Sequence, residues 1–283
     1  MQDWVRDYLR TLTLLQEKPS RAFLKKIIRA HIRTFPFENI SKLISKEQRN
    51  GTVSIPGPEE FLASHHNRHT GGTCFALNAN LLKLLKALGF EGYYIHPGED
   101  HMAIVLKDPE SSHNNMYVDV GTTAPLFDPI SFEGRKKMIP AFAGEKLLFL
   151  PGPQKGVYSY IRVRGDQIIN KKWTFSIYDE LEEKEFYPWV KNTYKDTAPF
   201  MNKLRCQLWQ PEKRRGLSIN NRHFTIRNAS GGVLVKSVSD RESLRCILHE
   251  EFNFPRLPLD HALSILEEKQ IALFEETKKE RGS

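Results

Sequence analysis

A short segment at residues 69–74, His-Thr-Gly-Gly-Thr-Cys, runs directly into a leucine-rich stretch, and this junction constrains the chain more than any other feature. The leucines recur at the spacing of one helical face. They are Leu77, Leu81, Leu84, Leu85 and Leu88. Gly89 follows the last of them, which is typical of the position just after a helix end. The sequence therefore predicts a buried helix that begins at Cys74.

Cys74 lies where a cysteine side chain can be reactive. The two glycines before it allow a sharp turn, and Thr73 is a candidate N-cap residue. The N–H groups of a first helical turn and the positive end of the helix dipole favour a thiolate. A nucleophilic cysteine is one interpretation of this pattern. An inert buried cysteine at the start of a core helix is the other.

The composition is that of an ordinary globular protein. The 283 residues are enough for one large domain or a few small ones with substantial cores. Apolar residues make up 40% of the chain and charged residues 27%, both typical of soluble proteins. No stretch has the pattern of a secretory signal or the length of a membrane span. We therefore expect a cytoplasmic protein with no membrane partner.

The net charge of +8 raises the possibility of nucleic-acid binding, but the basic residues are scattered in pairs. They form no long run with interleaved aromatic residues, so we expect solvated faces and no nucleic-acid partner. A positive surface would still attract a polyanionic small molecule such as a nucleotide-bearing cofactor.

The three cysteines, Cys74, Cys206 and Cys246, are widely spaced and show no metal-ligand pattern. We expect neither a disulfide framework nor a metal site. Cys206 and Cys246 lie in apolar strand and helix patterns, which favours a structural role for both.

Hydrophobic periodicity divides the chain into three segments and indicates a mixed α+β class. Residues 1–89 carry helical patterns and end with the helix after Cys74. Residues 90–195 contain short alternating runs separated by turns, which predict a meandering antiparallel sheet or barrel. Residues 196–283 carry four short strand patterns and then two helices, the first capped by Asp240, with a frayed tail from residue 275.

Two further residues supply what a thiolate nucleophile needs, a nearby base and a group that holds this base in the right tautomer. His101 begins one predicted strand, and Asp119 lies in the later apolar run 116–121, where a buried carboxylate requires a partner. On this hypothesis His101 takes the proton of Cys74, Asp119 orients the imidazole, and N–H groups at the helix start bind an oxyanion. As an alternative, His101 and Asp119 only close turns.

Several motifs, in this order, resemble those of the arylamine N-acetyltransferases. They are Phe35-Pro36-Phe37-Glu38-Asn39, Thr70-Gly71-Gly72-Thr73-Cys74, His101, Asp119-Val120-Gly121, the segment 197–202 and the strand 224–227. The resemblance extends over nearly the whole chain. It implies an N-terminal helical bundle at 1–89, an antiparallel β-barrel at 90–195 and a C-terminal α/β lid at 196–283. These parts would surround a cysteine-protease-like triad of Cys74, His101 and Asp119.

The resemblance also implies a function. The cysteine of such enzymes takes an acetyl group from the co-substrate acetyl-CoA and passes it to an arylamine, arylhydrazine or arylhydroxylamine by a ping-pong mechanism. We therefore expect a transferase with a small-molecule acceptor. The alternatives are a related amide-forming acyltransferase with another acyl donor, and a catalytically degenerate member that only binds a ligand. The oligomeric state does not follow from the sequence.

One departure from the family pattern concerns the corner at residues 35–40, where we expect Glu38 and Asn39 to support the site. Thr70 stands where the family has an arginine that pairs with the glutamate of this corner. We expect Arg68 to take over the pairing with Glu38.

Two other departures lie around the expected base and pocket. The interval between Cys74 and His101 is shorter than in the family, so a strand or hairpin has been trimmed. Thr122 and Thr123 follow Gly121 where the family has Phe-Gly. These three residues are expected to line the acceptor and cofactor pocket.

Overall fold

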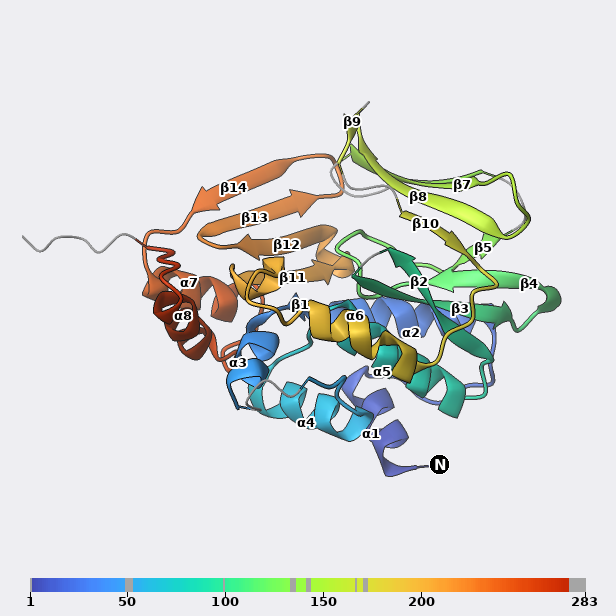
Figure 1. The fold of residues 1–283 in the computed structure, drawn as a ribbon, viewed down its shortest axis with the longest axis horizontal. Coiled ribbons are helices and arrows are strands. Elements are labelled where there is room, and N and C mark those ends of the chain that lie inside the picture. The colour runs from blue at the N-terminus through green and yellow to red at the C-terminus, as the bar shows by residue number, and fades with distance from the viewer. Residues whose placement is uncertain are drawn as a thin grey trace, which may run out of the picture.

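A layer of helices carries three antiparallel sheets (Figure 1). The structure is a computed structural model that describes residues 2–48, 53–98, 100–132, 136–140, 144–165, 167–169 and 173–274. The loop expected near residues 50–51 and the tail expected from residue 275 lie outside the described residues. The mixed α+β class expected from the sequence is confirmed.

The helical layer comes from the N-terminal part of the chain. Its helices are α1 (Asp3–Thr11), α2 (Arg21–Thr34), α3 (Ile40–Gln48), α4 (Pro58–Arg68) and α5 (Cys74–Ala87). Helix α2 begins where the Ser20 hydroxyl accepts a hydrogen bond from the Phe23 N–H at 3.0 Å, and it ends before Pro36. Helix α3 was not expected, because its sequence reads as the continuation of a turn. Gly89 follows α5 with φ at +91°, as the sequence predicted.

The middle of the chain forms two sheets. The first has the strand order β2-β3-β4-β5, from β2 (Gly92–Gly98), β3 (His101–Asp108), β4 (Ser111–Val118) and β5 (Ile130–Phe132). The second has the order β10-β8-β7-β6, with β9 (Gln167–Ile168) beside β8. Its strands are β6 (Lys137–Pro140), β7 (Glu145–Pro151), β8 (Val157–Arg164) and β10 (Trp173–Ser176). Strands β5 and β6 were not expected.

The expected closed β-barrel at residues 90–195 is wrong. A barrel requires a hydrogen-bonded ladder that returns to its first strand. Among the described residues, β5 ends one sheet and β6 ends the other, and no ladder joins the two sheets. The expected strand run 116–121 also ends early, because β4 stops at Val118 and leaves Asp119 just beyond it.

The third sheet combines distant parts of the chain in the order β1-β11-β12-β13-β14. Its strands are β1 (Phe37–Glu38), β11 (Arg205–Gln210), β12 (Arg215–Asn220), β13 (His223–Asn228) and β14 (Val233–Ser237). Helices α7 (Arg241–Glu250) and α8 (Leu259–Glu268) cover one face of it (Figure 1). The expected cap of α7 is confirmed, since the Ser243 N–H donates to Asp240 Oδ1 at 2.7 Å. Helix α8 ends before the expected residue 276.

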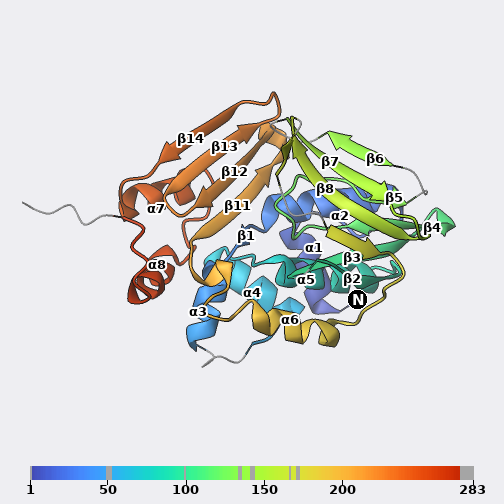
Figure 2. The ribbon, with the colours of Figure 1, turned by 45° about the horizontal axis from the view of Figure 1, so that its top comes forward.

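A connection crosses from the second sheet to the third. It contains a 3₁₀ turn at Glu183–Phe186, helix α6 (Tyr187–Asn192) and a second 3₁₀ turn at Pro199–Met201. A third such turn, Pro211–Lys213, joins β11 to β12. Helix α6 passes beside α5 in the views of Figures 1 and 2.

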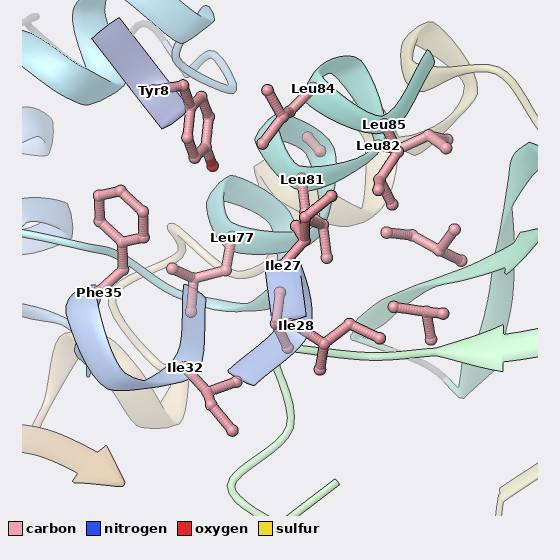
Figure 3. Packing of buried hydrophobic residues seen from close by; sticks show 14 of the residues in the cluster. Tyr8, Ile27, Ile28, Ile32, Phe35, Leu77, Leu81, Leu82, Leu84 and Leu85 are labelled. Atoms are coloured by element: carbon pink, nitrogen blue, oxygen red, sulfur yellow. The ribbon is translucent and has the colours of Figure 1, made fainter. Parts of the chain in front are cut away.

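Helix α5 is the centre of the largest buried cluster. Its leucines pack against the apolar face of α2, including Ile27 and Ile28 (Figure 3). Ile40 and Leu43 of α3 instead lie in the cluster formed with the third sheet, α7 and α8. Buried contacts therefore cross residue 89, and the division of the chain at residues 89 and 195 stays a prediction.

Two histidines are buried in or beside the helical layer. His31 Nε2 lies 2.9 Å from the Tyr8 hydroxyl, and His65 Nδ1 lies 2.9 Å from the Thr70 carbonyl oxygen. Burial, reinforced by His65, lowers the pKa of His31 to about 3. Burial also lowers the pKa of His65 to about 4, against the opposing effect of the Thr70 carbonyl. Both imidazoles are therefore neutral in the folded protein at neutral pH.

Lowering the pH from 7 to 5 should reduce the free energy of unfolding by about 2 kcal/mol for each of these histidines. The unfolded chain binds a proton on each imidazole near pH 6.5, whereas the folded state does not. This contribution is present above pH 6.5 and is lost as the pH falls. Urea denaturation at pH 7, 6 and 5 measures it. In His31→Gln, which keeps an amide near the Tyr8 hydroxyl, about half of the pH dependence should disappear. An unchanged dependence would contradict the assignment.

Candidate active site

Cys74 is the first residue of α5, as the sequence predicted. Thr73 occupies the N-cap position in extended conformation, but within the described part of the chain its side chain caps none of the helix N–H groups. The preceding segment lies directly against the corner at Pro36. The two are so close that a Cβ on Gly71 would collide with the Pro36 carbonyl oxygen. The Thr73 side chain thus leaves the first N–H groups of α5 uncapped beside the Cys74 sulfur.

The corner residues hold this segment in place. The Glu38 N–H donates to the Gly72 carbonyl at 3.0 Å. The Asn39 amide donates to the carbonyls of Phe200 and Lys203 at 2.7 and 2.6 Å, which ties the corner to the segment that leads into β11.

The expected pairing of Arg68 with Glu38 is wrong. Glu38 is fully buried and accepts hydrogen bonds from the Ser41 hydroxyl at 2.6 Å, the Ser41 N–H at 2.8 Å and the Gly71 N–H at 3.2 Å. Burial raises the pKa of Glu38, and these donors oppose the rise. Arg68 is exposed at the end of α4. Neutral donors from Ser41 and Gly71 therefore take the place that the family gives to an arginine.

His101 and Asp119 lie together, as expected. His101 Nε2 is 2.7 Å from Asp119 Oδ2, and both side chains are buried. The Tyr117 hydroxyl donates to the same oxygen at 2.8 Å. Asp119 Oδ1 accepts from the Asn78 amide at 2.9 Å and from the Gly121 N–H at 3.0 Å. Four donors thus satisfy a carboxylate that could not otherwise be buried.

The surroundings of His101 favour its charged form. Burial by itself would lower the pKa of His101, but the charges of Asp119 and of a Cys74 thiolate, with hydrogen bonds to both, raise it to about 10. Because Nε2 faces Asp119, Nδ1 is the ring nitrogen left for Cys74. The indole of Trp173 stacks on the imidazole with 4.4 Å between ring centroids.

Cys74 lies close to residues from the other segments. Its Sγ lies 3.4 Å from the Asp100 carbonyl oxygen. Gly121 lies so near that an added Cβ would be 2.5 Å from the Cys74 Cα. This close contact explains why a glycine follows the Asp119-Val120 pair.

A pocket of about 450 Å³ opens beside these side chains. Its lining includes Cys74, His101, Gly121, Thr122, Thr123 and Arg162. Residues 121–123 line this pocket, and their expected contact with acceptor or cofactor stays a prediction. In the part of the chain that the structure describes, no group of three or more His, Cys, Asp or Glu side chains could hold a metal ion.

Sequence reasoning missed Asn78, Tyr117 and Trp173. Asn78 lies one helical turn after Cys74, where its amide donates to Asp119 and to the Met102 carbonyl and its oxygen accepts from the Val120 N–H. An asparagine inside a leucine-rich helical face is a signal of a buried polar partner, and it could have been used. The roles of Tyr117 and Trp173 depend on strand positions that no local pattern gives.

The comparisons with known proteins agree with the resemblance that the sequence motifs indicated. A family model described as N-acetyltransferase matches residues 22–258. The chain belongs to the arylamine N-acetyltransferase family. It is therefore an acetyltransferase, as the sequence motifs indicated. No curated protein sequence matches it.

Solved structures of arylamine N-acetyltransferases share the fold at low sequence identity. The Salmonella typhimurium enzyme is 16% identical, with a TM-score of 0.75 over 96% of this chain and 98% of that one. The Mycobacterium abscessus enzyme is 16% identical, with a TM-score of 0.76 over 93% of each chain. The Mycobacterium marinum enzyme in complex with CoA is 15% identical, with a TM-score of 0.74 over 96% of this chain and 100% of that one.

No helix among the described residues is long and apolar enough to cross a membrane.

Replacing Asn78 with alanine should slow acetyl transfer from acetyl-CoA about 10- to 100-fold, because Asp119 loses a buried donor and no longer holds His101 in place. The alkaline limb of the pH–rate profile should also move to lower pH. Stopped-flow kinetics with acetyl-CoA measure both.

Asn80→Ala is the matched control, since Asn80 is equally buried on α5 but donates to the carbonyls of Pro56 and Ala76. It should lose stability without moving the pH–rate profile. Equal profiles for the two variants would show that Asn78 acts only on stability.

Proposed function

We propose that this enzyme transfers an acetyl group from acetyl-CoA to an arylamine, arylhydrazine or arylhydroxylamine through a thioester on Cys74. The observation that carries the proposal is a buried His101 whose Nε2 is hydrogen-bonded to Asp119 and whose charged form is favoured by Asp119 and by Cys74. Acetyl-CoA as donor is supported by family membership and by the Mycobacterium marinum relative in complex with CoA. A cytoplasmic location stays a prediction.

In the first half-reaction the Cys74 thiolate attacks the carbonyl carbon of acetyl-CoA. The new S–C bond forms, and N–H groups at the start of α5 stabilise the negative oxygen of the tetrahedral intermediate. The bond to the CoA sulfur then breaks, and the imidazolium of His101 gives its proton to this sulfur. The products are CoA with a free thiol, acetylated Cys74 and neutral His101.

In the second half-reaction the acceptor nitrogen attacks the acetyl carbon on Cys74. His101 can now act as a base, because burial still lowers the pKa of the imidazole and, of the two negative charges that raised it, Asp119 remains but the acetylated sulfur no longer carries its own. The imidazole takes the proton of the amine as the C–N bond forms and the bond to Cys74 breaks. The amide leaves, and the thiolate and imidazolium are restored.

An acyltransferase with another acyl donor would use the same residues and differ only in the pocket. A degenerate, ligand-binding member would not require a carboxylate with four donors beside a buried histidine. The arrangement around Asp119 therefore supports the catalytic alternative.

Incubation with acetyl-CoA should add one acetyl group to Cys74, and an arylamine should remove it. Intact-protein and peptide mass spectrometry measure both steps. Cys246, which is exposed on α7, serves as an internal control and should stay unmodified. Cys74→Ser should abolish both steps while leaving the thermal unfolding temperature nearly unchanged, because the side-chain volume changes little. An adduct on Cys246 alone would overturn the proposal.

Replacing Asp119 with asparagine should lower turnover by about 10³- to 10⁴-fold, because the amide favours the wrong His101 tautomer. In the unmodified enzyme His101 stays protonated until the pH rises through about 10, so acetylation of Cys74 should decline only above that pH. In Asp119→Asn the decline should begin nearer to neutral pH. Rapid-mixing rates from pH 6 to 10.5 test this. An unaltered profile would mean that a residue other than Asp119 orients and stabilises the His101 imidazolium.

A further inference from the structure

A lysine on α3 is buried near the start of α5. Lys42 is only 5% exposed. Its ammonium donates to the Thr193 hydroxyl at 2.6 Å and lies 4.4 Å from the centre of the Tyr194 ring. The Thr193 hydroxyl donates in turn to the Val190 carbonyl at 2.7 Å, so its oxygen is oriented to accept from Lys42. Two contacts at the end of α6 thus hold this ammonium in place.

The Lys42 ammonium has no carboxylate bound to it. Among the described residues Lys42 forms no ion pair, whereas Lys46, one turn later on α3, binds Asp196 at 2.6 Å. A buried cation is costly when no opposite charge accompanies it. An anion within range of the ammonium would offset this cost.

The cavity beside Lys42 leads to the segment before Cys74. Lys42 lines a cavity of about 120 Å³ together with Gly72 and Thr73, the two residues that precede Cys74. The Glu38 N–H, two residues before α3 begins, donates to the Gly72 carbonyl. Lys42 and Cys74 therefore lie in the first turns of two helices that begin at one hydrogen-bonded junction.

The charges of Lys42 and Cys74 influence each other. Burial lowers the pKa of Lys42 to about 8, against the opposing effects of a Cys74 thiolate and then of Asp100. Lys42 is therefore mostly protonated at neutral pH. Asp100 is exposed, so solvent weakens the effect of its carboxylate. Because electrostatic interactions are mutual, the ammonium favours the charged form of Cys74.

Two other charged side chains line the same cavity. They are Glu60 and Arg68 of α4, and both are exposed. Solvent screens charges at such positions. Among the described residues that line this cavity, Lys42 is the only charged one that is buried.

We propose that Lys42 stabilises the Cys74 thiolate, so that the reactive sulfur has a second cationic partner besides His101. The two cations come from different segments, since His101 begins β3 and Lys42 lies on α3. Lys42 is a positioning residue, because it acts on the sulfur and not on the substrate. This inference rests on the proposed function for the use of the thiolate in acetyl transfer.

Alkylation of Cys74 by iodoacetamide between pH 4 and 9 tests the proposal, because a thiolate reacts and a thiol does not. Lys42→Gln keeps a donor for the Thr193 hydroxyl but carries no charge. In this variant the pH of half-maximal alkylation rate should rise by about one unit. Below that pH the rate should fall about tenfold, because fewer molecules carry the thiolate. An unchanged half-maximal pH would overturn the proposal.

A second variant applies if Lys42→Gln does not fold. Lys42→Met replaces the ammonium with an apolar group on a side chain of similar length, which suits a buried position. It should show the same rise in the half-maximal pH. The proposal would not survive an unchanged value there.

Lys46→Gln is the matched control. Lys46 is on the same helix, but 25% of its side chain is exposed and its ammonium binds Asp196. The half-maximal pH of this variant should equal that of the parent enzyme. An equal rise in both variants would contradict the proposal, because the effect would then not depend on the position of Lys42. A Lys42→Gln variant that loses only thermal stability would show a structural role and would also contradict it.

Peptide mass spectrometry follows each cysteine separately. Cys246 is exposed on α7 and serves as the internal reference, so its alkylation should be the same in all variants. A shift at Cys246 as large as that at Cys74 would indicate a general effect of the substitution and would overturn the assignment.

Alkylation also separates failure of this inference from failure of the proposed function, since iodoacetamide requires neither acetyl-CoA nor an acceptor. A higher half-maximal pH in Lys42→Gln supports the role of Lys42 even if Cys74 takes up no acetyl group. Normal acetyl transfer without such a shift would overturn the inference and leave the proposed function intact.

Discussion

The hydrogen bonding of the buried Asp119 carboxylate is the interaction on which the rest of the site depends. A charge in this position requires several donors, and they come from α5, β3, β4 and the following turn. Satisfying Asp119 therefore fixes the helix of Cys74 relative to the strand of His101. The hydrogen bonds that compensate for the burial of the carboxylate also bring the Cys74 sulfur and the His101 imidazole together.

The electrostatics of the pocket follow from this centre. Asp119 and Cys74 favour a positive imidazole on His101, against the effect of burial. On another side of the cavity, the Arg162 guanidinium donates hydrogen bonds to the Thr123 hydroxyl and to Glu145. The cationic groups that line the pocket, His101 and Arg162, are thus each paired with a carboxylate.

The corner at residues 36–39 shows how a family interaction can be replaced. Glu38 stays buried although Thr70 has no guanidinium group to offer, because a hydroxyl and two N–H groups bind its oxygens. The raised pKa of Glu38 is the physical consequence, since neutral donors compensate for burial less than a cation does. Arg68 could not replace the missing arginine, because α4 ends with this side chain at the surface.

The sequence by itself determined helix α5, its start at Cys74 and its end before Gly89, because helical periodicity and glycine chemistry are local. It also determined the order of Cys74, His101 and Asp119. Only the tertiary structure decided the partners of Asp119, the open sheets in place of a barrel, and the meeting of Arg162 with Thr123. These depend on strand pairing and packing between segments far apart in the chain, which no local pattern of residues encodes.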